Sequence, residues 1–336
     1  MIPFETFADF DLREHNTMGI AAHARPLIDV HDITALPSIW STFTHPPLIL
    51  GSGSNVVFAA DPSVPVVRLR NDDVEWLSDD GDHVRLRVGA GKVWHELVME
   101  TVSQGLFGIE NLALIPGTVG ACPIQNIGAY GVEVNSVIES VHAYEPATGE
   151  WHHLSNEDCQ FAYRHSLFKD DLTRFVIADV TFNLYRLGEP KLDYANLREM
   201  VSSESPTPLE IANAVIAIRS SKLPNPRQLG NAGSFFKNPI VSLQTATALA
   251  EQHADMPMFR GSTDATRKLS AAWLIEHAGF KGIRDGDAGV APGHALVLVN
   301  YGNATGSDIM RLADRIADAV LQKFGVRIEP EPRVIR

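Results

Sequence analysis

The sequence contains little cysteine. Cys122 and Cys159 are the two cysteines in 336 residues, and neither belongs to a CxxC pair or to a Cys/His cluster at ligand spacing. This scarcity argues against a disulfide framework and against a structural zinc site. We expect two free, partly buried thiols in a reducing cytosol and no metal centre.

Basic charge is also in short supply. The chain has 28 lysines and arginines against 41 aspartates and glutamates, which gives a formal net charge of −13. A broadly acidic surface repels phosphate backbones and anionic lipids, so it argues against nucleic acid and membranes as partners. It still permits a small anionic substrate in a locally basic pocket.

The sequence also shows neither the pattern of a leader peptide nor a long, unbroken apolar run. The first 20 residues lack the basic and apolar regions of a signal peptide, which predicts a cytoplasmic protein. The uncharged stretch 111–132 contains two prolines and four glycines, so it is too broken to span a membrane. Such a stretch instead predicts backbone packed closely against something large.

Hydrophobic patterns predict a mixed chain of strands and helices in two or three lobes. A Ser/Pro-rich segment at 186–225 indicates a lobe boundary. The last helix is expected to start at Ser307 as N-cap, to end before Gly325 and to be followed by an extended tail over 326–335. The other expected elements are strands at 47–50, 66–69, 84–88, 137–144 and 175–184, and helices at 93–102, 208–219, 241–252 and 268–278.

Two glycine loops lack parts of the familiar phosphate-binding motifs. In GSGSNVVF (51–58), Val56 stands where a dinucleotide fingerprint needs its third glycine, and in VGAGKVW (88–94) Trp94 stands there. Neither loop ends in the GK[ST] of a P-loop. A Rossmann or P-loop protein is therefore disfavoured.

The first of these loops can still bind an anion. Gly51 and Gly53 let backbone N–H groups approach it, and Ser54 and Asn55 add donors. A tight surface turn explains this loop equally well.

The stretch 111–131 (NLALIPGTVGACPIQNIGAYG) is more specific. Its glycines leave room for a planar ligand, its isoleucines supply apolar walls, and two amides can orient the ligand. A buried loop between strands, the alternative, predicts fewer glycines. The residues concerned are Gly117, Gly120, Ile115, Ile124, Ile127, Gln125 and Asn126.

Nine motifs follow one another along the chain. They are GSGSNVVF, VGAGKVWHELV, ENLALIPGTVGACPIQNIGAYGVE, FAYRHSLFK, IRSSKLPNP, GNAGSFFKNP, AAWLIEHAG, ALVLVN and EPEPRVI. On these motifs the chain, from about Asn16 onward, resembles the UDP-N-acetylenolpyruvoylglucosamine reductase family. The segment LDYANL around Tyr194 resembles the form of the family with an additional tyrosine loop.

The resemblance implies an α+β (mixed α/β) fold. It is the two-subdomain FAD-binding fold of the vanillyl-alcohol/p-cresol oxidoreductase type, followed by a C-terminal substrate-binding α+β domain. The implied parts are residues 1–70 and 71–220 for FAD, 221–325 for substrate, and a tail, 326–336, returning to the active site. The implied ligands are non-covalent FAD, NADPH and the enolpyruvyl sugar nucleotide, and we expect a monomer.

The implied reaction is an NADPH-dependent reduction of the enolpyruvyl ether, through FAD, to UDP-N-acetylmuramate for peptidoglycan. Arg164 and Glu331 would stabilise the enolate, and Ser234 would protonate it. Glu329 rivals Glu331, because residues two apart on a strand face the same side. A surface ion pair for Arg164, and a turn or N-cap for Ser234, are the alternatives that residue type alone favours.

The remaining site residues follow from the same motifs. His294 departs from relatives that carry Gln, so its role is open. Arg219 is implied as an FAD contact. The alternative is that its charge stabilises the dipole at the C-terminal end of a helix. The implied FAD contacts are Gly51, Ser52, Gly53, Ser54, Asn55, Pro116, Gly117, Thr118, Gly120, Ala121, Ile124, Gln125, Asn126, Gly128, Ala129, Tyr130 and Arg219. The implied substrate contacts are Tyr163, Tyr194, Lys222, Asn238 and His294.

Two other functions compete with this reading. One is a flavin-dependent oxidase of the same fold, although the GSGS loop lacks the His or Cys that often tethers flavin in oxidases. The other is a non-catalytic protein that binds flavin or a sugar nucleotide.

Overall fold

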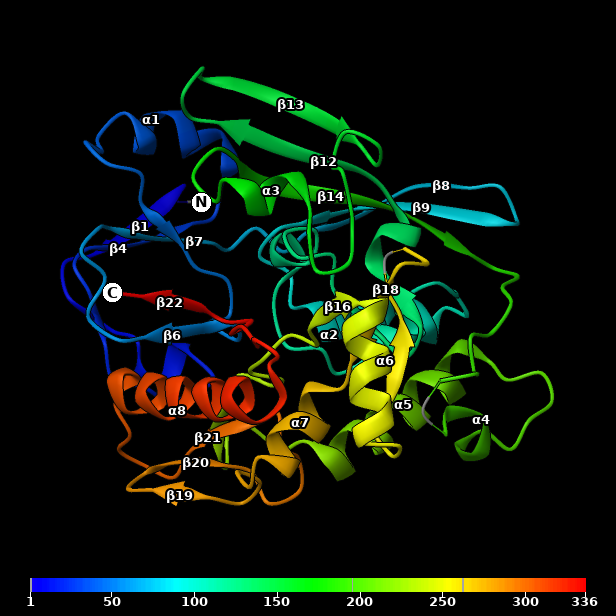
Figure 1. The fold of residues 1–336 in the computed structure, drawn as a ribbon. Helices are drawn as coiled ribbons and strands as arrows, with labels where there is room; N and C mark the ends of the chain where they lie inside the picture. The colour runs from blue at the N-terminus through cyan, green and yellow to red at the C-terminus, as the bar shows by residue number, and fades with distance from the viewer. Residues whose placement is uncertain (1, 195, 262) are drawn as a thin grey trace. The chain divides into compact units, whose positions relative to one another are not determined.

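The computed structural model describes residues 2–194, 196–261 and 263–336, which form two compact units. Unit 1 comprises the chain up to Phe10, Ala24–Ser52 and Ser63–Ser220. Unit 2 comprises Asp11–His23, Gly53–Pro62 and Ser221–Arg336. Each unit is therefore assembled from three separate stretches of sequence (Figure 1).

The smaller sheet of unit 1 has the strand order β1-β4-β7-β5. β4 (Leu27–Val30) and β5 (Leu48–Ile49) run parallel to β7 (Val66–Leu69), and β1 (Phe4–Phe7) runs antiparallel to β4. All four residues of β4 are buried. Apolar side chains from this sheet and from the adjoining turn and helix, η2 (Ile33–Ala35) and α1 (Leu36–Trp40), form a second core together with Tyr144 and Val176 of the larger sheet.

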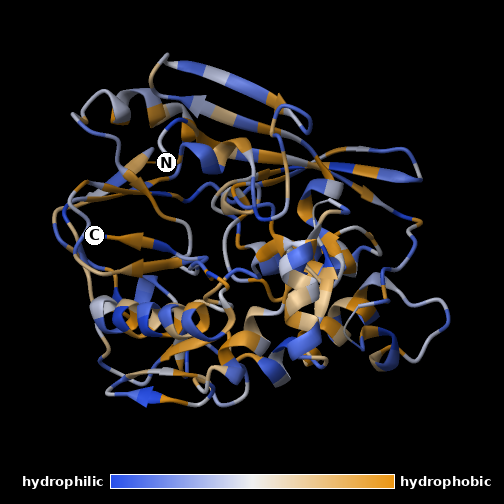
Figure 2. Cartoon of the chain, in the orientation of Figure 1, coloured by the Kyte–Doolittle hydropathy of each residue, from blue (hydrophilic) through white to orange (hydrophobic). Residues whose placement is uncertain are grey.

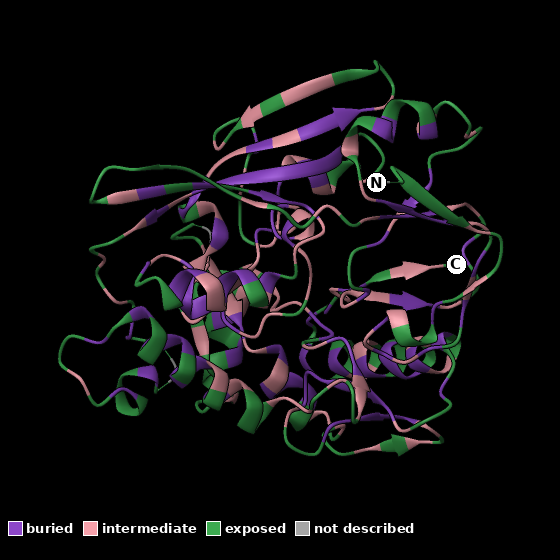
Figure 3. Cartoon of the chain, turned by 180° about the vertical axis from the view of Figure 1, so that it is seen from behind, coloured by how far each residue is buried: buried purple, intermediate pink, exposed green. Residues whose placement is uncertain are grey.

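The larger sheet of unit 1 is antiparallel, in the order β13-β12-β14-β9-β8. Its central strand, β14 (Val176–Tyr185), is buried along almost its whole length, whereas β13 (Glu150–Ser155) is not, as Figure 3 shows. β9 (His83–Gly89) alternates buried valine and leucine with exposed arginine, which confirms the expected half-buried strand. The other two strands are β8 (Val74–Asp79) and β12 (Ile138–Glu145).

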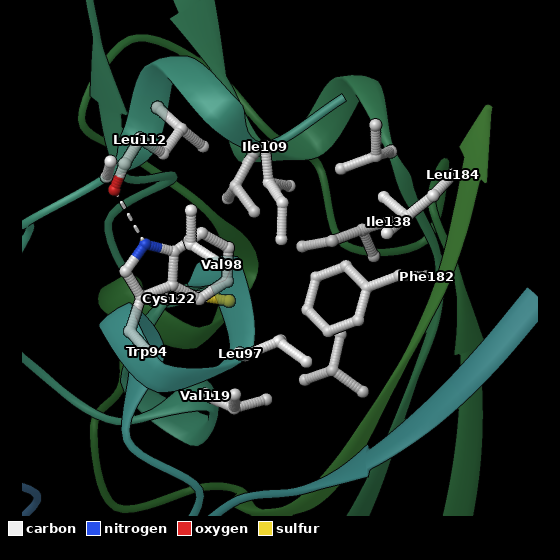
Figure 4. Close-up of a cluster of buried hydrophobic side chains, with 14 of the residues drawn as sticks. Trp94, Leu97, Val98, Ile109, Leu112, Val119, Cys122, Ile138, Phe182 and Leu184 are labelled. Atoms are coloured by element: carbon white, nitrogen blue, oxygen red, sulfur yellow. Dashed lines mark hydrogen bonds between the residues drawn. The ribbon is translucent and has the colours of Figure 1, made fainter. Parts of the chain in front are cut away.

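The helix α2 (Trp94–Ser103) packs into the main hydrophobic core of unit 1. Trp94 is 1% exposed, and its ring lies 6.0 Å from that of Phe182 on β14. The indole N–H donates to the Leu112 carbonyl at 3.0 Å, so the polar end of this large side chain is satisfied inside the core (Figure 4). Trp94 thereby connects α2 to the uncharged stretch that begins at 111.

Unit 1 also contains several short elements and one long helix, α5. The short ones connect the strands and the loops described below. They are η3 (Glu110–Leu112), η4 (Val119–Ala121), β10 (Gly128–Ala129), β11 (Val132–Glu133), η5 (Val134–Ser136), α3 (Leu167–Asp170) and α4 (Leu197–Met200). The helix α5 (Pro208–Lys222) ends two residues into unit 2.

Unit 2 contains small sheets and three helices. One sheet has the order β15-β21-β20-β19, a second has the order β16-β18-β17, and β22 pairs in parallel with β6. The strands are β6 (Val56–Phe58), β15 (Gly230–Asn231), β16 (Ile240–Ser242), β17 (Met258–Arg260), β18 (Thr266–Leu269), β19 (Arg284–Asp285), β20 (Ala288–Val290), β21 (Leu298–Asn300) and β22 (Arg333–Ile335). The helices are α6 (Leu243–Gln252), α7 (Ala271–His277) and α8 (Gly306–Phe324), with the turn η1 (Arg13–His15); the short strands β2 (Phe10–Asp11) and β3 (His23–Ala24) lie where the chain passes between units.

The strongly amphipathic helix α8 is confirmed, but its expected start is wrong. Its apolar stripe is buried, and Figure 2 shows polar and apolar residues alternating along the helix. The N-cap is Thr305 and not Ser307: the Thr305 hydroxyl accepts from Asp308 N–H, while the Asp308 carboxylate accepts from Thr305 N–H at 3.0 Å. This reciprocal pair, a capping box, requires an acidic residue three positions after the cap, which Ser307 lacks.

The other expected strands and helices are present within a few residues of the predicted bounds, so the mixed strand and helix content is confirmed. Cys122 and Cys159 are free, as expected, and both are buried. Within the described part of the chain, no helix is both long enough and apolar enough to cross a bilayer. The division into four parts stays a prediction.

The capping box gives a stability prediction. Thr305→Ala removes the acceptor of the Asp308 N–H in the first turn of α8, so we expect a loss of about 1 kcal/mol in the free energy of unfolding, measured by urea titration. Ser307→Ala is the matched control and should change this free energy by less than about 0.5 kcal/mol. Equal losses in the two variants would contradict the assignment of the cap.

Candidate functional site

The uncharged stretch 111–131 of unit 1 lies against the residues that follow β9. The main-chain N–H of Trp94 donates to the Gly117 carbonyl at 3.0 Å, and the main-chain N–H of Gly120 donates to the Ala90 carbonyl at 2.9 Å. A Cβ atom on Gly120 would lie 2.6 Å from the Cβ of Ala90. Packing within the protein therefore requires glycine at position 120.

The first residue of the glycine loop 51–58 contacts this stretch. A Cβ on Gly51 would lie 2.9 Å from Oγ1 of Thr118 and 3.8 Å from the Cβ of Ala121, so all three residues are close neighbours in unit 1. Ser52 is the last residue of the loop in unit 1. The rest of the loop belongs to unit 2: Gly53, Ser54 and Asn55.

Most of the residues expected to contact FAD in the stretch 116–130 are partly accessible and uncharged. Their neighbours Leu112, Val119 and Cys122 are buried and hold the stretch to the core of unit 1. A neutral, partly exposed surface on a fixed backbone is suited to a large, flat ring system. The partly or fully exposed members are Pro116, Gly117, Thr118, Gly120, Ala121, Ile124, Gln125, Gly128, Ala129 and Tyr130.

Asn126 is the exception, because its side chain is fully buried. Its amide donates to the Glu133 carboxylate at 2.9 Å and to the Ala162 carbonyl at 3.2 Å, and its oxygen accepts from Asn135 N–H at 3.1 Å. Asn126 itself has φ +44°. The side chain thus joins three segments of the protein, and its assignment as an FAD contact stays a prediction.

Tyr130 lies at the tip of a two-residue hairpin between β10 and β11. Tyr130 and Gly131 have φ values of +49° and +80°, the pattern of a type I′ turn, which matches the twist of the paired strands. The Tyr130 ring contacts Tyr194 edge to face at 6.0 Å between ring centres. Burial raises the pKa of Tyr130, so its hydroxyl is a neutral donor.

Asn111 fixes this arrangement and was not singled out from the sequence. Its side chain is fully buried, and its amide donates to the carbonyls of Tyr130 at 2.8 Å and Lys191 at 2.7 Å. One side chain thus holds both the hairpin and the segment that leads to Tyr194. A signal was available, because Asn111 is a polar residue directly before the apolar run Leu112–Ile115.

Arg219 on α5 is a half-buried cation whose Nε atom is itself buried and has no hydrogen-bond partner among the described residues. Burial lowers the pKa of its guanidinium, and Tyr130 opposes that shift. His95 is a neighbour that sequence reasoning missed: its Nδ1 accepts from Leu114 N–H at 3.1 Å, and burial followed by Arg219 lowers its pKa. A buried donor without an acceptor is costly unless a ligand supplies one.

Arg164 projects from a tight turn toward the same stretch. Its Nη2 donates to the Gly128 carbonyl at 2.8 Å, and its guanidinium lies 5.4 Å from the centre of the Tyr163 ring. A Cβ on Gly128 would lie 3.1 Å from Nη1 of Arg164. Unit 1 therefore brings the guanidinium, Tyr163 and the second half of the uncharged stretch together.

Unit 2 brings Ser234 and Glu331 together through the main chain. Phe235 N–H donates to the Leu296 carbonyl at 2.7 Å, and Glu331 N–H donates to the Phe235 carbonyl at 2.8 Å. The tail thus lies antiparallel to the segment that follows Ser234, with a bridge between Phe236 and Pro330. Beyond it, Arg333 N–H donates to the Asn55 carbonyl, where β22 joins β6.

The two glutamates of the tail differ in their surroundings. The Glu329 side chain is 67% exposed and forms an ion pair with Lys237 at 3.6 Å. Glu331 is only partly exposed. Solvent weakens an exposed ion pair such as that of Glu329. The surroundings of Glu329 are therefore those of an ordinary surface residue.

His294 lies in the turn that precedes Leu296. Its Nδ1 accepts from Leu296 N–H at 3.2 Å, which leaves the proton of the neutral ring on Nε2. Burial, followed by the charges of Lys222 and Lys281, lowers its pKa. His294 is therefore neutral near pH 7, and Lys222 belongs to its surroundings in unit 2.

The side-chain oxygen of Asn238 is used in a hydrogen bond within the protein. This oxygen accepts from Ala271 N–H at 2.9 Å at the start of α7. The nitrogen of the amide is the group with which Asn238 can bind a ligand. Within residues 2–194, 196–261 and 263–336, no three His, Cys, Asp or Glu side chains are arranged to hold a metal ion.

Two family models match the chain. Residues 28–155 match the model described as "FAD binding domain". Residues 225–335 match the model described as "UDP-N-acetylenolpyruvoylglucosamine reductase, C-terminal domain".

Curated relatives match nearly the whole chain. A UDP-N-acetylenolpyruvoylglucosamine reductase of Xylella fastidiosa (strain M12) is 51% identical over 98% of this chain and 95% of its own length. One of Xanthomonas euvesicatoria pv. vesicatoria is 49% identical over 96% of this chain and 94% of its own length.

A solved structure agrees with these matches. The crystal structure of the UDP-N-acetylenolpyruvylglucosamine reductase of Thermus caldophilus is 25% identical, covers 99% of both chains and has a TM-score of 0.69. The expected fold, an FAD-binding domain followed by a C-terminal domain of the reductase type, is confirmed. The chain belongs to the UDP-N-acetylenolpyruvoylglucosamine reductases, a family of FAD-dependent oxidoreductases.

Proposed function

We propose that this enzyme reduces UDP-N-acetylenolpyruvoylglucosamine to UDP-N-acetylmuramate with NADPH, for peptidoglycan synthesis in the cytoplasm. The observation that carries the proposal is the match of relatives with this reductase name along 98% of the chain, at 51% identity. Both the FAD-binding part and the C-terminal part are thus included in one alignment. The names of these relatives also weigh against an oxidase and against a non-catalytic binding protein.

FAD fits the residues of unit 1. The neutral, partly exposed stretch 116–130 provides a surface for its ring system, and the orphaned Nε of Arg219 provides a buried donor for one of its oxygens. In unit 1, Gly51 and Ser52 would supply further N–H groups, and Gly53, Ser54 and Asn55 of unit 2 stay proposed contacts. When bound, FAD supplies hydride transfer between the nicotinamide and the vinyl ether.

Arg164 binds the substrate carboxylate in this proposal. A guanidinium keeps its charge at any pH of interest and offers two parallel donors to a carboxylate. Its contact with the Gly128 carbonyl holds the side chain beside the uncharged stretch. There it stabilises the negative charge that develops on the carboxylate side of the double bond.

Ser234 donates the proton that completes the reduction, and Glu331 orients the substrate carboxylate. The hydrogen bond from Glu331 N–H to the Phe235 carbonyl, at 2.8 Å, supports a joint role. A serine hydroxyl is a weak acid, but a carbon-centred enolate is basic enough to take its proton. The surface ion pair of Glu329 supports assigning the role to Glu331.

The rest of the substrate is held by groups suited to a nucleoside diphosphate sugar. Lys222 supplies a mobile point charge for the diphosphate. His294 supplies a neutral Nε2–H donor, Asn238 its amide nitrogen, and Tyr163 and Tyr194 supply rings and hydroxyls. The whole assignment is tested by the absorption spectrum of the purified protein: NADPH should bleach the flavin bands, and the enolpyruvyl substrate should restore them.

Loss of the Ser234 hydroxyl should affect one half-reaction. We expect Ser234→Ala to slow reoxidation of the reduced enzyme by substrate about 10²–10⁴-fold, because one positioned acid contributes that much. Reduction by NADPH should stay near the wild-type rate, measured by stopped-flow absorbance. Ser307→Ala is the control, and equal slowing of both half-reactions would contradict the role.

The two tail glutamates make a matched pair. Glu331→Gln should slow reoxidation by substrate about 10²-fold or more, since it removes the carboxyl group that is assigned to the substrate carboxylate. Glu329→Gln removes only an exposed ion pair and should leave the rate within about twofold of wild type. The reverse ranking would transfer the role to Glu329.

Arg219 gives a prediction for cofactor binding. Arg219→Met removes the buried donor, so the dissociation constant of FAD, measured by quenching of flavin fluorescence, should rise about tenfold or more. Arg311→Met, which removes an exposed arginine from α8, is the control. Unchanged FAD affinity in Arg219→Met would remove Arg219 from the cofactor site.

A further inference from the structure

The turn that carries Arg164 has an unfavourable backbone at its tip. Ala162 and His165 exchange two hydrogen bonds of 3.0 Å, so Tyr163 and Arg164 form a two-residue loop. Arg164 has φ +53° and Tyr163 has no positive φ, which matches a type II turn with Arg164 at its second central position. That position favours glycine, because an L side chain disfavours left-handed backbone.

The base of the turn is anchored to the uncharged stretch. The Ser166 hydroxyl donates to the Ile124 carbonyl at 2.7 Å, and the buried Asn126 amide donates to the Ala162 carbonyl at 3.2 Å. These bonds fix the two ends of the turn. They do not contact the peptide of Arg164 itself.

Lys169 makes that contact. It lies on α3, five residues after Arg164, and its Nζ donates to the Arg164 carbonyl at 2.7 Å. The side chain is half-buried. A charged donor to a carbonyl is a strong hydrogen bond, and this one fixes the orientation of the peptide on the C-terminal side of Arg164.

The guanidinium is held from the other side. Nη2 donates to the Gly128 carbonyl at 2.8 Å, and a Cβ on Gly128 would lie only 3.1 Å from Nη1, so glycine at 128 allows this close approach. The residue is thus held at both ends, by Lys169 at its carbonyl and by Gly128 at its guanidinium. If the carbonyl contact is lost, Arg164 can relax to negative φ, which redirects the whole side chain.

We propose that Lys169 is a positioning residue for the reductase reaction: its ammonium group holds Arg164 in left-handed backbone so that the guanidinium faces the substrate carboxylate. The proposal rests on the role of Arg164 given under the proposed function. Lys169 itself touches neither substrate nor cofactor in this scheme. Its effect reaches the reaction through the direction of the Arg164 side chain.

The test compares Lys169→Met, Lys169→Arg and Lys323→Met by stopped-flow absorbance. Lys323 is a matched control, since its Nζ also donates to a main-chain carbonyl, that of His277 on another helix. Lys169→Met should slow reoxidation by the enolpyruvyl substrate about tenfold to a hundredfold, as expected for a displaced catalytic group. Reduction by NADPH, FAD content and melting temperature should stay at wild-type values, Lys169→Arg should restore most of the rate, and Lys323→Met should match wild type.

A second set of variants separates this proposal from the role of Arg164. If Arg164→Met slows reoxidation and Lys169→Met adds nothing in that background, Lys169 acts through Arg164. If Arg164→Met is slow but Lys169→Met is fast, the inference about Lys169 is overturned and the proposed function stands. If Arg164→Met is as fast as wild type, the role of Arg164 fails instead.

Two more outcomes would overturn the inference. One is equal slowing of both half-reactions by Lys169→Met, and the other is a further loss on adding it to Arg164→Met. Lys169→Gln, which keeps a polar side chain but removes the charge, serves if Lys169→Met does not fold. If neither Lys169→Met nor Lys169→Gln folds, Lys169 has a purely structural role and the inference is overturned.

Discussion

The contact between Gly120 and Ala90 is the constraint on which the site of unit 1 depends. The uncharged stretch can lie along the chain after β9 because position 120 has no side chain, and a Cβ there would lie 2.6 Å from that of Ala90. The main-chain hydrogen bonds from Trp94 to Gly117 and from Gly120 to Ala90 require the same close approach. The Tyr130 hairpin and the Arg164 turn are both built onto the stretch, so their positions follow from this contact.

Backbone strain is concentrated near the site. Six described residues other than glycine have positive φ, and four of them belong to the uncharged stretch or the turn that contacts it: Leu114, Asn126, Tyr130 and Arg164. Such conformations persist only where the surroundings over-determine them. Here buried polar side chains do so, since Asn126 and Asn111 each join their own segment to two others. The rigidity of the loops therefore comes from side-chain amides as much as from the strands.

The sequence predicted what depends on local pattern. Alternation gave β9, and the apolar stripe gave α8, because each side chain in them responds to one buried face. The start of α8 was wrong, since Thr305 and Ser307 are both good caps and only a partner three residues later decides between them. The resemblance of motifs supplied the family and the candidate site residues. The local pattern alone could not assign roles to these residues. His95, Asn111 and Lys169 were missed, because their roles come from tertiary contacts that neither motif nor periodicity specifies.

The pairing of β22 with β6 has a consequence for the order of folding. Residues 333–335 lie beside residues 56–58, so most of the chain separates the two partners. Contacts between segments this distant form slowly, because the entropy of closing the intervening chain must be overcome first. The strand that follows Glu331 can therefore join its unit only late in folding, and a chain cleaved between the two partners loses this connection.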